Sequence, residues 1–270
     1  MTGQGSQLQE VDRGFSAKAA EYDELSGSDA VTIWLRSRIR VLVESKLPPN
    51  GSILELNAGS GIDAAYFASQ GYRVHATDVA AGMLDALAAK ASLPESNGRL
   101  SWERRDFTDL KGLPGAPFDL VFSNLGGLNC IEDPGVVARQ LPDVLKPGGA
   151  VVWVVMPPVC PWEIAQVGRG HFGTAFRRFK RGGTLAHVEG AHVRTWYHSA
   201  RKVQRALGPS FSDVRVRSFC LFAPPSFFEG FTRRHPKLTQ WLTRLDDRLG
   251  AFWPSREAGD FIAITATYDG

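Results

Sequence analysis

The sequence predicts an α/β fold in which helices cover both faces of a mostly parallel, seven-stranded sheet. Short apolar strands alternate with helical segments from residue 52 onward, and this alternation is typical of parallel βαβ units with right-handed crossovers. The chain has 270 residues, of which 43% are apolar and 22% charged, so it is long enough to bury one large core. We therefore expect one doubly wound domain.

The elements follow from apolar spacing along the chain. A first helix is predicted from Ala30 to Lys46, ending before Pro48 and Pro49, and we expect it to lie against a sheet edge. Apolar residues that alternate with polar ones, or that form short runs, predict strands. Apolar residues spaced three or four positions apart predict helices. The expected strands are 52–56, 73–77, 100–104, 118–123, 150–156, 214–221 and 261–268. The later helices are expected at 61–70, 80–91, 134–145 and 199–207.

Acidic and basic residues are segregated along the chain. Residues 164–256 contain 17 Lys/Arg and 5 Asp/Glu, whereas the remainder contains 14 Lys/Arg and 23 Asp/Glu. This pattern indicates either a solvated basic surface or an electropositive wall that faces an anionic ligand, carrier or membrane surface. No apolar run is long enough to span a bilayer and no secretory signal is present, so a cytoplasmic protein is expected.

Cysteine usage gives no sign of a disulfide framework. Cys130, Cys160 and Cys220 lie far apart and lack the spacing of a metal site. We expect reduced, buried thiols and no bound metal.

A strand, a turn of small residues and a helix start occupy residues 53–61, which read Ile-Leu-Glu-Leu-Asn-Ala-Gly-Ser-Gly. Glu55 lies just before the turn, where a carboxylate would repel a pyrophosphate but not the cationic amino and sulfonium groups of S-adenosylmethionine. The segment resembles motif I of the class I S-adenosylmethionine-dependent methyltransferases, which have a Rossmann-like fold. Asn57 replaces the first glycine of the motif, and Asn tolerates a left-handed backbone.

Further segments resemble the same family at suitable distances. Asp78 ends the second strand, where an acidic side chain can accept hydrogen bonds from both ribose hydroxyls; a helix cap is the alternative. The resemblance implies that Met83 lines the adenine pocket, that Asp106 receives the adenine amino group and that the methyl group points toward Ser123 and Asn124. It implies a cofactor site made of Tyr22, Glu55, Asn57, Ala58, Gly59, Gly61, Asp78, Val79, Met83, Asp106, Phe107, Ser123 and Asn124.

Two other segments refine the resemblance. Residues 15–23 are similar to the family's F-x-x-x-A-x-x-Y-D segment, which closes over the cofactor and would bring Tyr22 to it. Residues 124–127 read Asn-Leu-Gly-Gly rather than the Asn-Pro-Pro-Tyr of the adenine- and glutamine-methylating branches. Methylation of a nucleobase amine is therefore disfavoured, and O- or C-methylation is favoured.

Four segments are expected in the domain organisation. An N-terminal helical cap occupies residues 1–29, of which 1–12 are polar and expected to be frayed, and the S-adenosylmethionine-binding core occupies 30–156. Residues 157–197 are expected to form a lid or substrate insertion, because a compact connection would need only a few residues. Residues 198–270 complete the sheet around a helical insertion at 225–254, in which Leu238, Trp241, Leu242, Leu245 and Leu249 mark one apolar face.

The catalytic residues carry the weakest signal. Methyl transfer from a sulfonium is an in-line displacement that depends mainly on positioning and water exclusion. If a base assists, the lid offers candidates, of which His192, His198 and Tyr197 are the first to test and His171 and His187 are the others. Arg177, Arg178 and Trp196 are the candidate substrate-binding residues.

The expected function is methyl transfer from S-adenosylmethionine, with S-adenosylhomocysteine as product, in small-molecule or natural-product biosynthesis. The acceptor is expected to be aromatic, lipid-like or carrier-bound and possibly anionic, approaching from the lid, where Phe172, Phe176, Phe179, Trp196, Phe227 and Phe228 supply apolar surface. One alternative is an RNA-modifying or RNA-binding protein that uses residues 177–181 on phosphates, although the near-neutral total charge disfavours nucleic acid. Another is a methyltransferase-like protein that binds the cofactor without catalysis.

Overall fold

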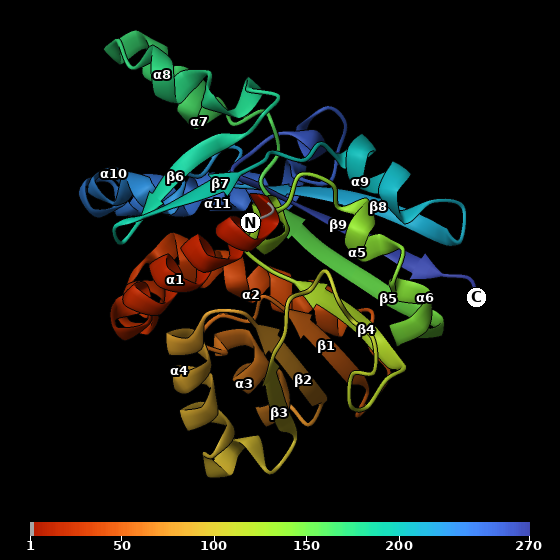
Figure 1. Cartoon of the computed structure of the whole chain (residues 1–270). Coiled ribbons are helices and arrows are strands. Elements are labelled where there is room, and N and C mark those ends of the chain that lie inside the picture. The colour runs from red at the N-terminus through yellow and green to blue at the C-terminus, as the bar shows by residue number, and fades with distance from the viewer. Residues whose placement is uncertain (1–2) are drawn as a thin grey trace.

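The computed structural model describes residues 3–270, and a seven-stranded sheet lies at its centre (Figure 1). The strand order is β3-β2-β1-β4-β5-β9-β8, with all neighbours parallel from β3 to β5 and with β9 antiparallel to both β5 and β8. The strands are β1 (Ser52–Leu56), β2 (Arg73–Asp78), β3 (Leu100–Arg104), β4 (Phe118–Ser123), β5 (Leu145–Val155), β8 (Phe211–Phe219) and β9 (Phe261–Tyr268). The predicted fold class is confirmed.

Helices cover both faces of this sheet, and alternation along the strands divides the core between them. In β5, Val151, Trp153 and Val155 face one layer, whereas Val152 and Val154 face the other. The first layer holds α5 (Gly135–Ala138), α6 (Leu141–Val144) and α9 (Ala200–Leu207). The second holds α2 (Ala30–Glu44), α3 (Ile62–Ser69) and α4 (Ala81–Ala91).

Two helix predictions need correction. The expectation that the first helix lies at a sheet edge is wrong: Leu35, Ile39 and Val43 of α2 are buried in the core layer above the sheet. The single helix expected at 134–145 is two short helices, α5 and α6. Pro142 lies at the start of α6 and has no N–H to continue the hydrogen bonds of a longer helix.

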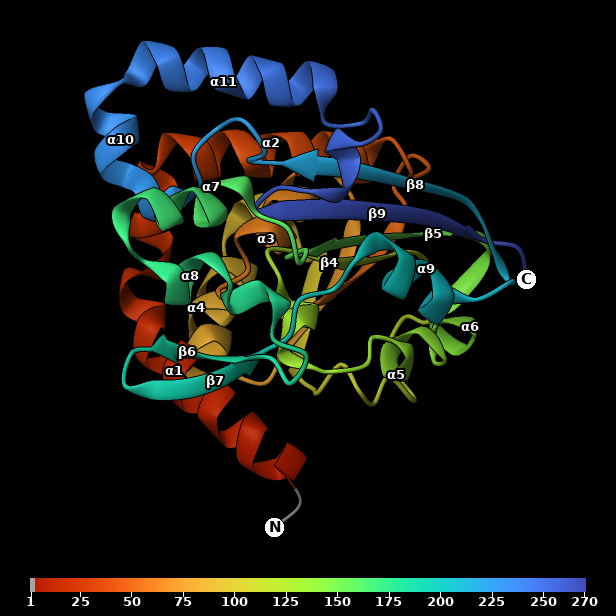
Figure 2. The ribbon, with the colours of Figure 1, turned by 90° about the horizontal axis from the view of Figure 1, so that it is seen from above.

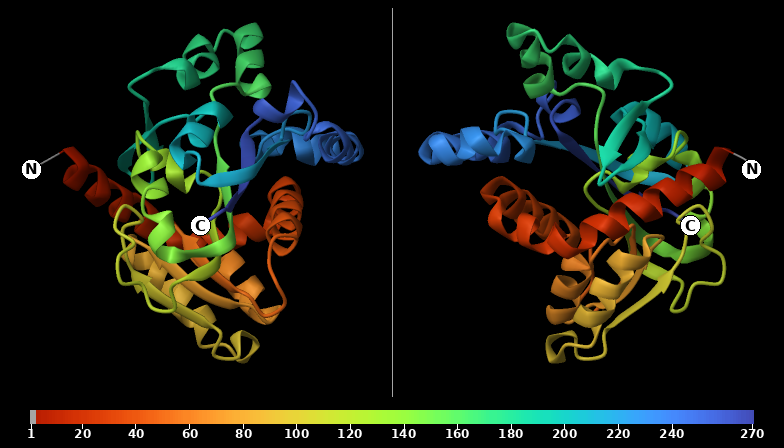
Figure 3. Two further views of the ribbon diagram at one scale, coloured as in Figure 1. Left: turned by 90° about the vertical axis from the view of Figure 1, so that its right-hand side faces the viewer. Right: turned by 60° about the vertical axis from the view of Figure 1, so that its left-hand side comes forward.

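The N-terminal segment is a helix, α1 (Gly3–Ser28), so the expectation of a frayed 1–12 is wrong for the residues that are described. Asp12 of α1 accepts the N–H of Ala81 at 2.9 Å and the guanidinium of Arg104 at 2.6 Å. A Cβ on Gly82 would lie 2.7 Å from the Ser16 carbonyl oxygen, so only glycine allows α1 to approach α4 so closely. Figure 3 shows α1 running between the core and the lid.

The lid, residues 157–197, contains more regular structure than its sequence indicates. It comprises α7 (Pro161–Ile164), α8 (Phe172–Ala175), and a hairpin of β6 (Thr184–Val188) and β7 (Ala191–Thr195). Glu189 and Gly190 connect the two strands with positive φ angles of 42° and 80°, as in the tight turns that match strand twist. The hairpin packs against α1, where the Val188 carbonyl oxygen would lie 2.8 Å from a Cβ on Gly14.

The C-terminal insertion contains α10 (Glu229–Arg234) and α11 (Pro236–Leu249), with α11 at the outer edge of the molecule beyond α2 (Figure 2). The carboxylate of Asp246 is buried and accepts N–H groups from Leu221, Phe222 and Ala223 at 2.8–3.2 Å, which fastens α11 to the end of β8. The face of α11 expected from its apolar residues is not packed into the core. Within residues 3–270, no helix is long and apolar enough to cross a membrane.

Candidate functional site

The turn after β1 meets the turn after β4 at the carboxyl ends of these neighbouring strands. The backbone is left-handed at Asn57, Gly59 and Gly61, with φ angles of 48°, 58° and 78°. The Asn57 side chain accepts the Ser123 hydroxyl at 2.7 Å and donates to the Asn124 carbonyl at 3.1 Å. The sheet order reverses between β1 and β4, and such reversal points are where open α/β sheets bind ligands.

Asp78, at the end of β2, holds the same turn from the other side. Its two carboxylate oxygens accept the N–H of Gly59 at 2.8 Å and the N–H of Ala80 at 2.9 Å. Burial raises the pKa of Asp78, and these two N–H donors oppose the shift. The side chain therefore ties the turn after β1 to the segment before α4, whose N-cap residue is Ala80, and it also lines the cavity described next.

Two cavities adjoin along the carboxyl ends of the strands. The first, of about 120 Å³, is lined by Val11, Phe15, Tyr22, Asn57, Gly59, Asp78, Val79, Met83, Arg105, Phe107, Asn124, Leu125, Gly126, Gly127 and Cys130. The second, of about 500 Å³, is lined by residues that include Asp106, Thr108, Ile131, Arg194 and Trp196. They share Val11, Val79, Phe107 and Cys130, so together they form one groove closed on one side by α1.

The groove brings together most of the residues implied by the family resemblance. Those that line it are Tyr22, Asn57, Gly59, Asp78, Val79, Met83, Asp106, Phe107 and Asn124. Those that do not are Glu55, Ala58, Gly61 and Ser123, which support the turns from behind.

Glu55 lies beneath the turn rather than in the lining of the groove. It is on the same side of β1 as Ile53, and only 2% of its surface is exposed. Burial and the nearby carboxylate of Asp63 raise the pKa of Glu55 well above its usual value. Asp63 itself accepts hydrogen bonds from Arg36, Arg40 at 2.8 Å and Asn124 at 2.8 Å. One carboxyl oxygen of Glu55, buried beneath the turn, has no hydrogen-bond partner among the described residues.

Sequence analysis found residues 15–23 of the α1 side of the groove but missed the part of α1 that precedes them. Val11, Phe15 and, in the second cavity, Leu8 are contributed by the segment whose beginning was interpreted as frayed. Together with Tyr22 they are spaced by three, four and seven residues, a helical period that could have revealed the buried face of α1. Nothing in the sequence indicated Cys130 or Leu125.

A third cavity, of about 340 Å³, lies between α1, the start of α2 and the turn before α10. Its lining includes Lys18, Leu25, Ser26, Asp29, Val31, Thr32, Leu35, Cys220, Phe227, Asp260 and Phe261. Tyr22 and Leu125 line both this cavity and the first one, so these two side chains separate the two spaces. The Tyr22 hydroxyl lies 3.3 Å from a guanidinium nitrogen of Arg36, which holds the ring in place.

The structure corrects the expectation that His198 acts as a base. The ring is fully buried, lines none of the three cavities, and its Nε2 lies 3.1 Å from the carbonyl oxygens of both Leu128 and Ile131. Burial, reinforced by the positive charge of Lys202, lowers the pKa of His198 to about 4. The side chain is a neutral donor that joins the segment after β4 to the end of the lid.

This burial predicts a pH dependence of stability. The folded state resists protonation of His198, whereas the unfolded chain takes up a proton near pH 6.5, so stability falls as the pH drops from 6.5 toward about 4. Between about pH 7 and about pH 5 the contribution is about 2 kcal/mol. Urea unfolding across this range should show a shallower loss for His198→Gln, which keeps an N–H donor but does not titrate. Equal slopes for the two proteins would contradict the assignment.

The other two catalytic candidates of the lid, His192 and Tyr197, are absent from the linings of the three cavities. His192 is exposed on β7 beside His187, with ring centroids 5.3 Å apart. The Tyr197 hydroxyl lies 3.3 Å from that of Thr184, and its ring stacks on the guanidinium of Arg178. Trp196 lines the second cavity together with Asp106, not the third.

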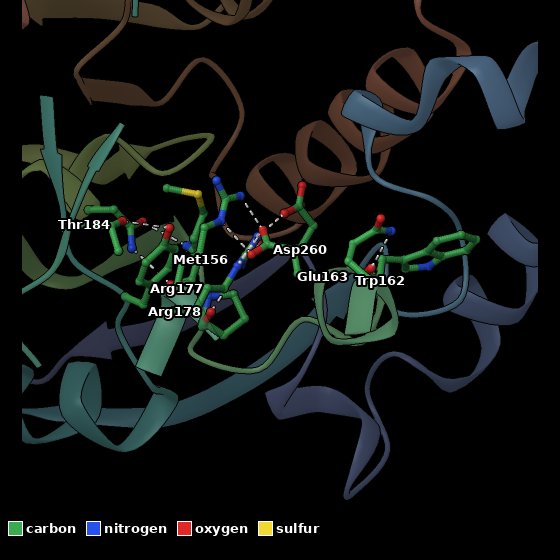
Figure 4. A network of polar contacts seen from close by, with 11 residues as sticks. Met156, Trp162, Glu163, Arg177, Arg178, Thr184 and Asp260 are labelled. Atoms are coloured by element: carbon green, nitrogen blue, oxygen red, sulfur yellow. Dashed lines mark hydrogen bonds and ion pairs between the residues drawn. The ribbon is translucent and has the colours of Figure 1, made fainter. Parts of the chain in front are cut away.

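Arg177 and Arg178 do not form an exposed basic wall (Figure 4). Arg178 is 4% exposed; its guanidinium donates to Glu163 and to Asp260, both at 2.6 Å. Arg177 also binds Glu163, at 2.5 and 2.7 Å. Although burial alone would raise it, the hydrogen bonds from both arginines lower the pKa of Glu163. Arg177 and Arg178 therefore neutralise buried carboxylates inside the lid. The expectation that they bind the substrate is corrected to this structural role.

The three cysteines were expected to be reduced and buried, and the structure agrees for all but Cys130, which is only partly buried. The three thiols are free, with Cys160 and Cys220 buried and Cys130 partly so. Ligand atoms of Cys160, Glu163 and Asp260 lie within 4.8 Å of one another, but Arg178 occupies both carboxylates.

Comparisons with known proteins agree with this geometry. Residues 53–149 match a methyltransferase-domain family. A comparison of the sequence with curated proteins finds no significant match. Among solved structures, phosphoethanolamine N-methyltransferase 2 of Haemonchus contortus, in complex with phosphomonomethylethanolamine and S-adenosylhomocysteine, has a TM-score of 0.62 at 16% identity, covering 96% of this chain and 59% of that chain.

Two further structures are similar over nearly their whole lengths. DhpI, in complex with S-adenosylhomocysteine, has a TM-score of 0.57 at 14% identity, and the [4+2]-cyclase SpnF has a TM-score of 0.63 at 16% identity. For each of them the comparison covers 97% of both chains. At such identities the likeness establishes the fold, and the family match supplies the activity. Residues 53–149 therefore form a methyltransferase domain, in a chain whose fold is that of S-adenosylmethionine-dependent methyltransferases.

Proposed function

We propose that this enzyme methylates an oxygen or carbon of a small-molecule acceptor that reaches the methyl group through the third cavity. The observation that carries this proposal is that Tyr22 and Leu125 line both the cofactor groove and the third cavity. A ligand in each space would meet at these two side chains. In-line transfer needs the donor and acceptor atoms in direct contact, so Tyr22 or Leu125 would shift aside when both ligands are bound.

The groove fits S-adenosylmethionine in its charges and apolar surfaces. Asp78 lines the groove and would accept the ribose hydroxyls, and Asp106, which lines it together with Phe107, would receive the adenine amino group. When bound, the cofactor supplies an electrophilic methyl group. The protein supplies position and water exclusion, for which α1 is the covering element.

The third cavity favours an acceptor with an apolar body and one polar end. Leu25, Val31, Leu35, Phe227 and Phe261 provide the apolar lining. Two carboxylates in the lining are already engaged, because Asp29 accepts the N–H of Thr32 at 2.7 Å and Asp260 binds Arg178. Lys18 is the remaining charged side chain in this lining, and it suits a phenolate, carboxylate or phosphate group on the acceptor.

The RNA alternative receives less support. Arg177 and Arg178 are bound to Glu163, so they are not available to phosphates. Lys180 and Arg181 remain exposed next to them, but two cations provide little of the phosphate neutralisation that nucleic-acid binding requires.

Two measurements test the proposal. S-adenosylmethionine and S-adenosylhomocysteine should each stabilise the protein by about 2.7 kcal/mol at about 100 times the dissociation constant, and NAD should not. With isotopically labelled donor, label should appear in small molecules extracted with organic solvent. Label in RNA would support the RNA alternative, and binding without transfer to any acceptor would support a non-catalytic role.

A cavity-filling variant tests the route of the acceptor. Ser26→Trp places an indole in the third cavity, so the acceptor KM should rise at least about tenfold while the S-adenosylhomocysteine affinity stays unchanged. Ser69→Trp, on the exposed end of α3, is the matched control and should behave like wild type. Wild-type kinetics in Ser26→Trp would show that the acceptor enters elsewhere.

A further inference from the structure

The outer surface of α11 carries large apolar side chains that nothing in the described chain covers. Leu238, Trp241 and Leu249 are 43%, 53% and 40% exposed. They lie on one side of the helix, because their spacings of three and eight residues are close to whole helical turns. The turn after α11 extends this surface with Phe252 and Trp253, which are 64% and 75% exposed. A soluble surface rarely gathers so many large apolar groups without a partner.

Positive charges border this apolar surface. Lys237, Arg244 and Arg248 are exposed and follow the same helical period, on the flank next to Trp241. The acidic residues of α11 do not offset them: Asp246 is buried, and Asp247 binds Arg38 at 2.7 and 2.8 Å. The surface is therefore an apolar strip with a cationic border.

The position of α11 on the outside of the protein also makes it accessible to a flat surface such as a membrane. Figure 3 shows α11 projecting from the body of the protein in both views. Its attachment runs through Asp246, which adjoins one border of the apolar strip, and the end of β8. Side chains at the tip of an attached helix can enter a surface without disturbing the core.

We propose that α11 and the turn after it, residues 236–254, bind the surface of membranes that contain anionic lipids, with the helix axis in the plane of the interface. Aromatic and leucine side chains would enter the headgroup region, and Lys237, Arg244 and Arg248 would meet anionic headgroups. This combination is typical of helices that lie on membranes. A second copy of the chain fits less well, because a symmetric pairing of two such surfaces brings the same cations together.

The proposed membrane-binding segment lies close in the chain to the third cavity, which links membrane binding to the proposed acceptor site. Phe227, 53% exposed, lines the third cavity and lies in the turn that leads into α10 and α11. If the proposed acceptor route is correct, this turn connects the acceptor cavity along the chain to the proposed membrane-binding segment. The membrane proposal itself does not depend on methyl transfer.

Sedimentation of the 270-residue protein with lipid vesicles tests the proposal without cofactor or acceptor, so its result is independent of the enzymatic activity. The protein should bind vesicles with about 30% phosphatidylglycerol and not vesicles of phosphatidylcholine alone, with binding lost in high salt. The triple variant Lys237→Gln, Arg244→Gln, Arg248→Gln should bind about a hundredfold more weakly. The double variant Trp241→Ser, Trp253→Ser should bind at least about tenfold more weakly.

A control variant that loses three positive charges elsewhere distinguishes an effect of this surface from an effect of the protein's net charge. Lys111, Arg201 and Arg205 are exposed elsewhere on the chain, and their triple replacement by glutamine should leave vesicle binding nearly unchanged. Equal weakening in both triple variants, or no binding to anionic vesicles, would overturn the proposal. Light scattering without lipid provides the other contrary outcome: a dimer that Trp241→Ser dissociates would assign the surface to a second copy.

Discussion

Replacing Arg178 with methionine should lower the free energy of unfolding by about 3–5 kcal/mol, the range for breaking a buried ion pair on one side. The substitution leaves the carboxylates of Glu163 and Asp260 in a space that solvent does not reach, with Arg177 as the remaining cation near Glu163. Urea unfolding measures the loss. Arg181→Met, at an exposed position of the same lid, should change stability by less than about 0.5 kcal/mol. A loss in Arg178→Met no greater than this control would contradict the structural role.

This expectation changes how defects in the lid should be interpreted. Kinetic defects of Arg178 variants report a disrupted lid, not a lost contact with an acceptor. Substitutions that test acceptor binding therefore belong in the third cavity, at residues such as Ser26.

Asp78→Asn should weaken S-adenosylhomocysteine binding by about tenfold to a hundredfold, which corresponds to about 1–3 kcal/mol. An asparagine keeps the size of the side chain but has one acceptor oxygen, whereas both Asp78 oxygens accept backbone N–H groups at the turn. The proposed ribose contact would lose a charged acceptor as well. Titration calorimetry measures the affinity directly.

The matched control is Asp119→Asn at the opposite end of the sheet. Asp119 accepts the N–H and hydroxyl of Ser52, both at 2.8 Å, near the start of β1. Its replacement should reduce stability but leave ligand affinity unchanged. If Asp78→Asn binds as tightly as wild type, Asp78 serves only to hold the turn.

The central sheet could be predicted from the sequence because each strand carries its own local pattern. The bounds of β1, β3, β4 and β9 were predicted to the residue. The polar start of α1 carries no such pattern at first sight. Its helix depends on contacts with α4 and the lid hairpin, which lie far away in the sequence, and most helical stability comes from such packing.

The candidate site divides in a similar way. Residues near Asn57, Asp78 and Asp106 belong to local motifs whose positions at strand ends are fixed by the fold, so they could be found in advance. The third cavity joins α1, α2 and the turn at 226–228, and no local pattern connects these segments. The same limit explains Arg178: composition counts its charge but cannot show that Glu163 and Asp260 lie beside it.

The placement of α1 has a consequence for the timing of turnover. The helix forms one wall of the groove, so separation of α1 from its neighbours would open that side of the groove to ligand exchange. Its polar fastenings include Asp12 to Ala81 and Asp23 to Ser60, which are local and partly solvated, so they can open without unfolding the sheet. We therefore expect that the rate at which α1 opens limits how often spent cofactor leaves and a new turnover begins.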